Sequence, residues 1–271
     1  MFIAGRVVRR LLVTAKVLGI TSLAGEIYLL TEKERDQVEV YDVITYQIMR
    51  RMTVPNNQYL TDIASCEKRK CVYFADAHAE CIHKLKVKCV SFTGWEVHDE
   101  PSGFSVNAAH NVLVTCRRVR KIKEFSSNGD LLRELAIPDG VANPWHAIQT
   151  PYSAEFIVCF GSSFGKIRGV CKISADSPCV VQSHGGKPGS GIGQYSSPRH
   201  LAVDDDGSVF VADFENKRVT LLSPTMEYVR EIVSRDQFKG NPSRLHLNVQ
   251  RRQLYVADNK YLNSAVAVFA V

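Results

Sequence analysis

The sequence predicts an all-β chain folded as a six-bladed β-propeller, with four antiparallel strands in each blade. Three observations predict this fold. A hairpin strand recurs six times along the 271 residues, the strands alternate apolar and polar residues, and the copies lie about one propeller blade apart. The composition, 45% hydrophobic and 23% charged, is that of a globular domain and excludes disordered, collagen-like and coiled-coil chains.

The clearest copy of the repeat spans residues 197–213. It reads as a strand, an Asp-Asp-Gly turn and a second strand that ends in Val-Ala-Asp. Gly207 supplies the positive φ that the turn requires. Residues 61–76 and 245–258 end in the same pattern of apolar, aromatic, apolar, Ala and Asp. These copies define a blade hairpin.

Three weaker copies fill the gaps and end at Thr31, Cys116 and Phe160. Six second strands therefore end at residues 31, 76, 116, 160, 213 and 258, at intervals of 45, 40, 44, 53 and 45 residues. Third strands are expected at residues 37–41, 81–85, 121–125 and 218–222, and fourth strands at 46–52, 131–135 and 228–233. Units of this length with short strands are typical of propeller blades.

The two ends of the chain complete each other. After residue 258 only one more strand fits, at 264–269, so the sixth blade lacks an outer strand. The segment 6–13 alternates like a strand and has no partner in the first blade. We expect it to close the sixth blade from outside, because an open sheet edge invites aggregation, and we expect residues 1–271 to form a single domain.

Residues 198–222 resemble an NHL repeat, with Pro198, the Asp-x-Gly turn, Val-Ala-Asp and then Asn216-Lys217-Arg218. Over its six units the chain resembles six-bladed propellers of the NHL and TolB-like kind. The resemblance implies that Asp76, Asp213 and Asp258 are structural and tie the loop that follows each second strand. Some NHL propellers bind single-stranded RNA on one face, so the resemblance also makes RNA a candidate ligand.

The start of each innermost strand should face the central channel. Aligning the six copies places six residues in one ring there: Gly19, Asp62, Gly103, His146, His200 and Arg244. The two histidines each lie in a Pro-x-His motif. We predict that Asp62, His146, His200 and Arg244 form a binding site at the channel mouth.

The Pro-x-His motif is similar to that of the peptide amidating lyase, another six-bladed propeller. This resemblance implies three histidines around a zinc ion in the channel. Only two histidines fit here, and the guanidinium of Arg244 would repel a cation. Calcium-dependent lactonase propellers resemble the chain in fold alone, and the ring offers one carboxylate where calcium needs several oxygens. We therefore expect no metal, no cofactor and no catalytic residue, with a metal-dependent lyase or lactonase as the third alternative.

The loops after the second strands should surround the same mouth and are basic. They carry Arg117, Arg118, Arg120, Trp145, Lys166, Arg168, Lys217, Arg218 and Lys260, in a chain of formal net charge +6. Phe164, Phe214 and Tyr261 are expected near the same rim. Basic turns at 68–70 and 251–252 should lie on the opposite face.

These features predict a non-enzymatic recognition scaffold that binds a protein or peptide of acidic character on the loop face. The alternative is a propeller that binds single-stranded RNA. The apolar stretch after Lys16 ends before Glu26, which is too short for a bilayer span, and no cleavage pattern of a signal peptide follows it. We expect a monomeric cytoplasmic protein without membrane contact.

Eight cysteines leave three interpretations open. Cys66 and Cys71 flank one predicted turn, and Cys81 and Cys89 follow. They are either small apolar strand residues, or a disulfide between Cys66 and Cys71, or ligands of a metal at spacings outside the usual zinc pattern.

Overall fold

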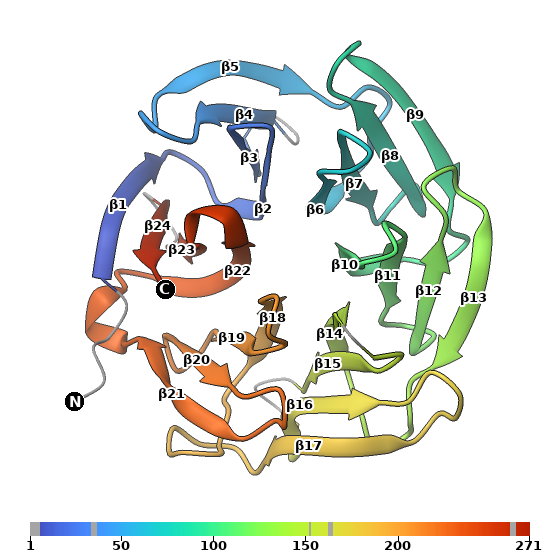
Figure 1. The fold of residues 1–271 in the computed structure, drawn as a ribbon, viewed down its shortest axis with the longest axis vertical. Helices are drawn as coiled ribbons and strands as arrows, with labels where there is room; N and C mark the ends of the chain where they lie inside the picture. The colour runs from blue at the N-terminus through green and yellow to red at the C-terminus, as the bar shows by residue number, and fades with distance from the viewer. Residues whose placement is uncertain (1–5, 34–36, 152, 162–164, 261–263) are drawn as a thin grey trace.

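The computed structural model describes residues 6–33, 37–151, 153–161, 165–260 and 264–271. It confirms the predicted fold: six sheets of four antiparallel strands stand in a ring around a central channel (Figure 1). Helix in these residues is confined to two short 3-10 turns, η1 (Arg235–Gln237) and η2 (Val249–Arg251). The described residues contain no helix long and apolar enough to span a bilayer.

Five blades are consecutive runs of strands, ordered from the channel outwards. They comprise β2 (Val17–Leu23), β3 (Glu26–Thr31), β4 (Gln37–Asp42) and β5 (Ile48–Thr53); β6 (Leu60–Cys66), β7 (Cys71–Asp76), β8 (Cys81–Lys86) and β9 (Ser91–Glu96); β10 (Pro101–Val106), β11 (Val112–Cys116), β12 (Lys121–Phe125) and β13 (Leu131–Ala136); β14 (Pro144–Gln149), β15 (Phe156–Phe160), β16 (Arg168–Ile173) and β17 (Val180–Gly186); β18 (Pro198–Val203), β19 (Val209–Asp213), β20 (Arg218–Leu222) and β21 (Tyr228–Val233).

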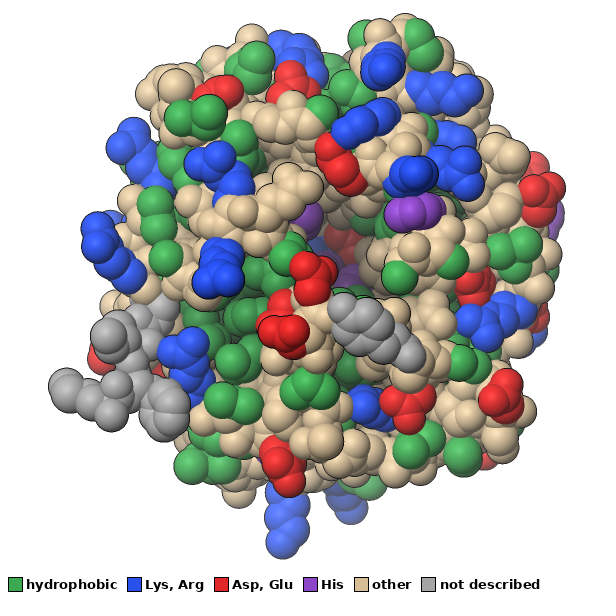
Figure 2. All heavy atoms as spheres, in the orientation of Figure 1, with side chains coloured by type: hydrophobic (Ala, Val, Ile, Leu, Met, Phe, Trp, Pro, Cys, Tyr) green, Lys and Arg blue, Asp and Glu red, His purple; other side chains and the backbone are tan. Residues whose placement is uncertain are grey.

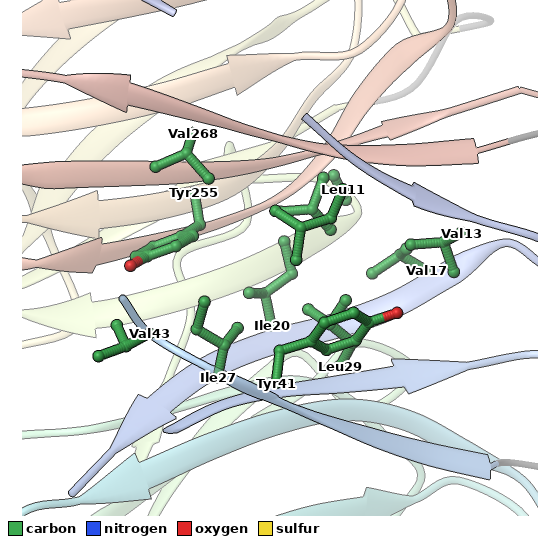
Figure 3. Packing of buried hydrophobic residues seen from close by; sticks show 12 residues of the cluster. Leu11, Val13, Val17, Ile20, Ile27, Leu29, Tyr41, Val43, Tyr255 and Val268 are labelled. Atoms are coloured by element: carbon green, nitrogen blue, oxygen red, sulfur yellow. The ribbon is translucent and has the colours of Figure 1, made fainter. Parts of the chain in front are cut away.

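The sixth blade joins the two ends of the chain, as predicted. Its inner strands are β22 (Asn241–Asn248), β23 (Gln253–Asn259) and β24 (Ser264–Ala270), and β1 (Arg6–Val13) pairs antiparallel with β24 on the outside. Leu11 and Val13 of β1 are buried among side chains of the first and sixth blades (Figure 3). An ion pair of 3.1 Å joins Arg10 to Asp258 of β23. The N-terminal strand thus seals the ring.

The three aspartates that end second strands are fully or nearly buried and structural. They tie the loop that enters the same blade, in addition to the following loop that the resemblance implied. Asp76 accepts the N–H groups of Gln58 and Tyr59, Asp213 those of Ser196 and Ser197, and Asp258 those of Lys239 and Gly240. The following loop is tied as well, since the N–H of Ala79 also donates to Asp76. Each aspartate therefore fixes where an innermost strand begins.

All eight cysteines are free thiols. Cys66 and Cys71 lie opposite each other in the β6–β7 hairpin, and both are buried in an apolar cluster with Tyr73 and Phe104. Burial raises the pKa of the Cys71 thiol. Of the three interpretations left open, the structure shows small buried strand residues at Cys66 and Cys71, with no disulfide between them.

We expect that removal of residues 1–13 destabilises the whole propeller. The deletion exposes the edge of β24 and the pocket that Leu11 and Val13 fill, each side chain worth about 1.5–3 kcal/mol. A loss of about 3 kcal/mol or more should lower Tm by about 10 °C in a chain of this size. The comparison is by thermal unfolding with a deletion of residues 1–5, which leaves every described strand intact. Equal Tm values for the two deletions would refute the closure.

Candidate binding site at the channel mouth

A β-bulge lies near the start of every innermost strand. The register with the second strand shifts between Leu60 and Asp62, between Pro144 and His146 and between Pro198 and His200, and at the matching place in the other three blades. In five blades one residue lies inside the bulge and lines a wide mouth, namely Leu18, Thr61, Ser102, Trp145 and Arg199, and in the sixth blade two do, Ser243 and Arg244. In five blades the bulge thus separates a mouth residue from the ring residue that follows it, whereas Arg244 of the sixth blade belongs to the ring and also lines the mouth.

Four residues of that ring, from four blades, meet inside the channel. The imidazole rings of His146 and His200 stack with their centroids 3.8 Å apart. His200 Nε2 lies 3.6 Å from Asp62 Oδ2, and Arg244 Nε lies 3.4 Å from Asp62 Oδ1. The structure therefore brings Asp62, His146, His200 and Arg244 together as a cluster.

Burial and hydrogen bonds set the charges of the cluster. His200 Nδ1 accepts the N–H of Leu245 at 3.3 Å, so the proton of the neutral ring lies on Nε2, toward Asp62. Burial lowers the pKa of both histidines, that of His146 strongly. Burial alone would raise the pKa of Asp62, but Arg244 and His200 lower it to about 2. At neutral pH the cluster holds one carboxylate, two neutral imidazoles and one guanidinium.

The cluster does not fit a zinc site of the three-histidine kind. Asp62, His146 and His200 could offer ligand atoms within 4.8 Å of one another. The carboxylate, however, already accepts the N–H groups of Ile63 and Phe104 and faces the guanidinium of Arg244. A fixed cation beside the only anionic ligand opposes the binding of a metal ion, so the residues of the cluster do not fit one.

A second group with metal-ligand residues, Asp76, Cys81 and His83, is also occupied internally. His83 Nε2 lies 3.2 Å from Asp76 Oδ2 and 3.5 Å from Cys81 Sγ. Burial opposes protonation of His83, but these hydrogen bonds raise its pKa to about 9. A protonated imidazole cannot ligate a metal, so this group is a structural ion pair.

The mouth above the channel cluster is a cavity of about 1120 Å³. Nine cationic side chains line it: Lys16, Arg117, Arg118, Arg120, Arg199, Lys217, Lys239, Arg244 and Lys260. Glu100 is the one acidic side chain among the described residues of its lining. The mouth is therefore strongly electropositive.

The opposite end of the channel differs from the mouth. It holds a cavity of about 180 Å³ lined mainly by apolar side chains together with His146, His200 and His246. Figure 2 looks onto this end, with histidine visible in the central opening and acidic side chains beside it among basic ones. The two faces thus carry different charge patterns, although both have basic residues.

Six of the nine residues predicted on the loop face line the mouth: Arg117, Arg118, Arg120, Trp145, Lys217 and Lys260. Arg168 and Arg218 are instead buried, because their guanidiniums bind carbonyl oxygens of the loop before β18, those of Ser196 and Gln194 among them. Lys166 is exposed but does not line the cavity. Phe164 and Tyr261 lie outside the described residues.

Three further cations that the sequence did not predict there also line the mouth: Lys16, Arg199 and Lys239. Arg199 is the middle residue of Pro-x-His, and strict strand alternation would have signalled that it faces away from His200. Its guanidinium carbon lies 3.5 Å from the centroid of Phe214 and 5.3 Å from that of Trp145. The guanidinium of Arg117 lies 4.0 Å from the same Trp145 ring. Together these four residues, Arg117, Trp145, Arg199 and Phe214, form a stack that we call the arginine–aromatic ladder.

Comparisons with known proteins agree with the fold. Residues 195–220 match the NHL repeat family model. No curated protein matches the sequence. Similar solved structures include a Bacteroides thetaiotaomicron protein of unknown function (TM-score 0.72, 12% identity, 94% of this chain and 70% of that one) and Kuenenia stuttgartiensis hydrazine synthase (0.67, 15%, 90% and 74%). Another is virginiamycin B lyase from Staphylococcus aureus (0.62, 10%, 95% and 87%). At these identities the likeness shows the fold alone.

We predict that Asp62→Asn loses stability in a pH-dependent way. The folded-state pKa of Asp62 is about 2, below the value near 4 of an unfolded chain, so its contribution is present above pH 4 and is lost as the pH falls through 2. Denaturant unfolding should show wild type more stable than the variant by about 2 kcal/mol at pH 6, with the gap shrinking toward pH 2. Asp205→Asn, in an exposed turn, is the control; a gap constant with pH would contradict the assignment.

Proposed function

We propose that this chain, a six-bladed propeller with an NHL repeat at residues 195–220, is a non-enzymatic recognition module that binds an acidic polypeptide at the channel mouth. The observation that carries the proposal is the lining of the mouth, nine cations against one acid around an open cavity. Such a concentration of one sign attracts an oppositely charged partner and speeds its association.

Ion pairs within the described part of the chain reach four of the nine cations, since Lys16 pairs with Glu32, Arg118 with Glu100, Arg120 with Asp139 and Arg244 with Asp62. Arg118 pairs with Glu100 at 3.4 Å, on the rim. Lys217, Lys239 and Lys260 make no ion pair with a carboxylate in the part of the chain that the structure describes. A partner with several carboxylates would supply the missing countercharge.

The arginine–aromatic ladder favours an acidic polypeptide over single-stranded RNA. Proteins that bind RNA single strands offer exposed aromatic faces on which bases stack. Here two guanidiniums already lie over Trp145 and one over Phe214. The aromatic rings therefore support arginines, whose charge is what the mouth offers to a ligand.

The channel cluster supports a binding role over an enzymatic one. His146 Nε2 contacts the carbonyl oxygen of Phe104, and His200 contacts the N–H of Leu245 and the carboxylate of Asp62. Neither ring contacts a hydroxyl or thiol nucleophile among the described residues, so the pairing of base and nucleophile that covalent catalysis needs is missing there.

The test is fluorescence anisotropy with a labelled peptide of alternating glycine and glutamate, beside a labelled oligouridine of equal length. We expect the peptide to bind more tightly than the RNA, with an affinity that falls as salt rises and does not respond to EDTA. Lys217→Glu/Lys260→Glu should weaken peptide binding by about tenfold or more, which corresponds to about 1.4 kcal/mol.

The matched control reverses two exposed charges on the opposite face, Lys68→Glu/Arg69→Glu. This variant has the same net charge as the mouth variant and should bind the peptide within about twofold of wild type, because the two faces are separated by more than a Debye length of about 8 Å. Equal losses for the two variants, or tighter binding of the oligouridine, would overturn the proposal.

A further inference from the structure

We propose that Arg199 is the specificity-determining residue of the mouth and holds one carboxylate of the partner in a bidentate pair. The inference rests on the proposed function, in which the mouth binds an acidic polypeptide. It assigns different roles to the cations of the mouth: the rim lysines attract the partner over a distance, and Arg199 recognises one group by geometry.

The surroundings of Arg199 orient its guanidinium and leave its donors available. The ring of Phe214 lies 3.5 Å away, Trp145 flanks it, and Nε donates to Ser197 Oγ at 3.2 Å. Stacking on an aromatic ring fixes the plane of a guanidinium while its edge stays open for two parallel N–H···O bonds. Neither terminal nitrogen of Arg199 has a hydrogen-bond partner among the residues that the structure describes.

The other arginines of the mouth have acceptors of their own. Arg117 donates to Asn143, Arg118 pairs with Glu100, and Arg120 pairs with Asp139. Arg244 donates to the carbonyl oxygens of Thr61 and Ser243. Among the arginines of the lining, Arg199 is therefore the one whose two terminal nitrogens are both available to donate hydrogen bonds to a ligand.

Electrostatics favour an anion at the same place. Burial lowers the pKa of Arg199; the attraction of Glu215 opposes this, and repulsion from Arg244 and Arg117 adds to it. A carboxylate on the guanidinium would replace lost hydration and relieve the repulsion among the three arginines.

The shape of the channel limits how the carboxylate arrives. His146, His200 and Asp62 are 2%, 7% and 1% exposed and fill the channel below Arg244. A polypeptide cannot thread through, so it reaches Arg199 with an acidic side chain or with its C-terminal carboxylate. Both present the same planar pair of oxygens.

The test compares Arg199→Lys with Arg118→Lys, which makes the same replacement at an exposed arginine of the same rim. Lysine keeps the charge but loses the planar fork and the stacking. With the labelled glycine–glutamate peptide, Arg199→Lys should raise Kd by about tenfold or more and Arg118→Lys by less than about twofold. The ratio of the two should persist at about 0.5 M salt, where rim charges are screened.

Two further peptides distinguish the source of the carboxylate. If a peptide with a C-terminal amide binds like the free acid, the carboxylate that pairs with Arg199 belongs to a glutamate side chain. If a peptide with glutamine in place of glutamate and a free C-terminus still binds Arg199→Lys more weakly than wild type, the carboxylate is that of the C-terminus. If neither peptide retains that sensitivity, both groups are needed, which still fits the inference.

Phe214→Leu keeps Arg199 but removes its platform, and it should weaken peptide binding severalfold whether or not Arg199→Lys folds. Failure of wild type to bind any peptide would refute the proposed function. Tight binding by wild type with equal small effects of Arg199→Lys and Arg118→Lys, or no effect of Phe214→Leu, would refute the role of Arg199 alone.

Discussion

The β-bulge at the start of each innermost strand is the constraint on which the site depends. It recurs in all six blades, and the buried aspartates at the ends of three second strands hold the entering loops in place beside it. One residue turns into the mouth and the next turns into the channel. Four unrelated side chains and two glycines thereby form a ring, and Trp145 and His146, or Arg199 and His200, belong to two different layers from adjacent positions.

The two layers have opposite physical characters. In the channel, Asp62 and Arg244 neutralise each other beside two uncharged imidazoles, so the layer carries no net charge and closes the passage. At the mouth, cationic side chains outnumber acidic ones, and the aromatic rings of Trp145 and Phe214 pack against Arg117 and Arg199. The proposed binding of an acidic group rests on this combination of a closed floor and a basic rim.

The repeat made the fold predictable, and with it the channel ring. Blade length and hairpin pattern placed Asp62, His146, His200 and Arg244 in one register, because equivalent positions of the sequence repeat occupy equivalent places in the blades. The burial of Arg168 and Arg218 was not predictable, because a charged residue in a loop is expected to be exposed unless the carbonyl oxygens that accept its hydrogen bonds are known. The place of Arg199 at the mouth was not predicted, because it depends on Trp145 of a neighbouring blade, which lies 54 residues earlier in the sequence.

Both faces of the propeller carry basic residues, so the most direct measurement is of which face the partner covers. Hydrogen–deuterium exchange with and without the saturating glycine–glutamate peptide reports this for the whole chain at once. Binding at the mouth predicts slower exchange in the loops around Asn143, Phe214 and Gly240, and unchanged exchange in the turns at 67–70 and 249–252. Protection confined to those turns would contradict it, because the partner would then occupy the face opposite the mouth.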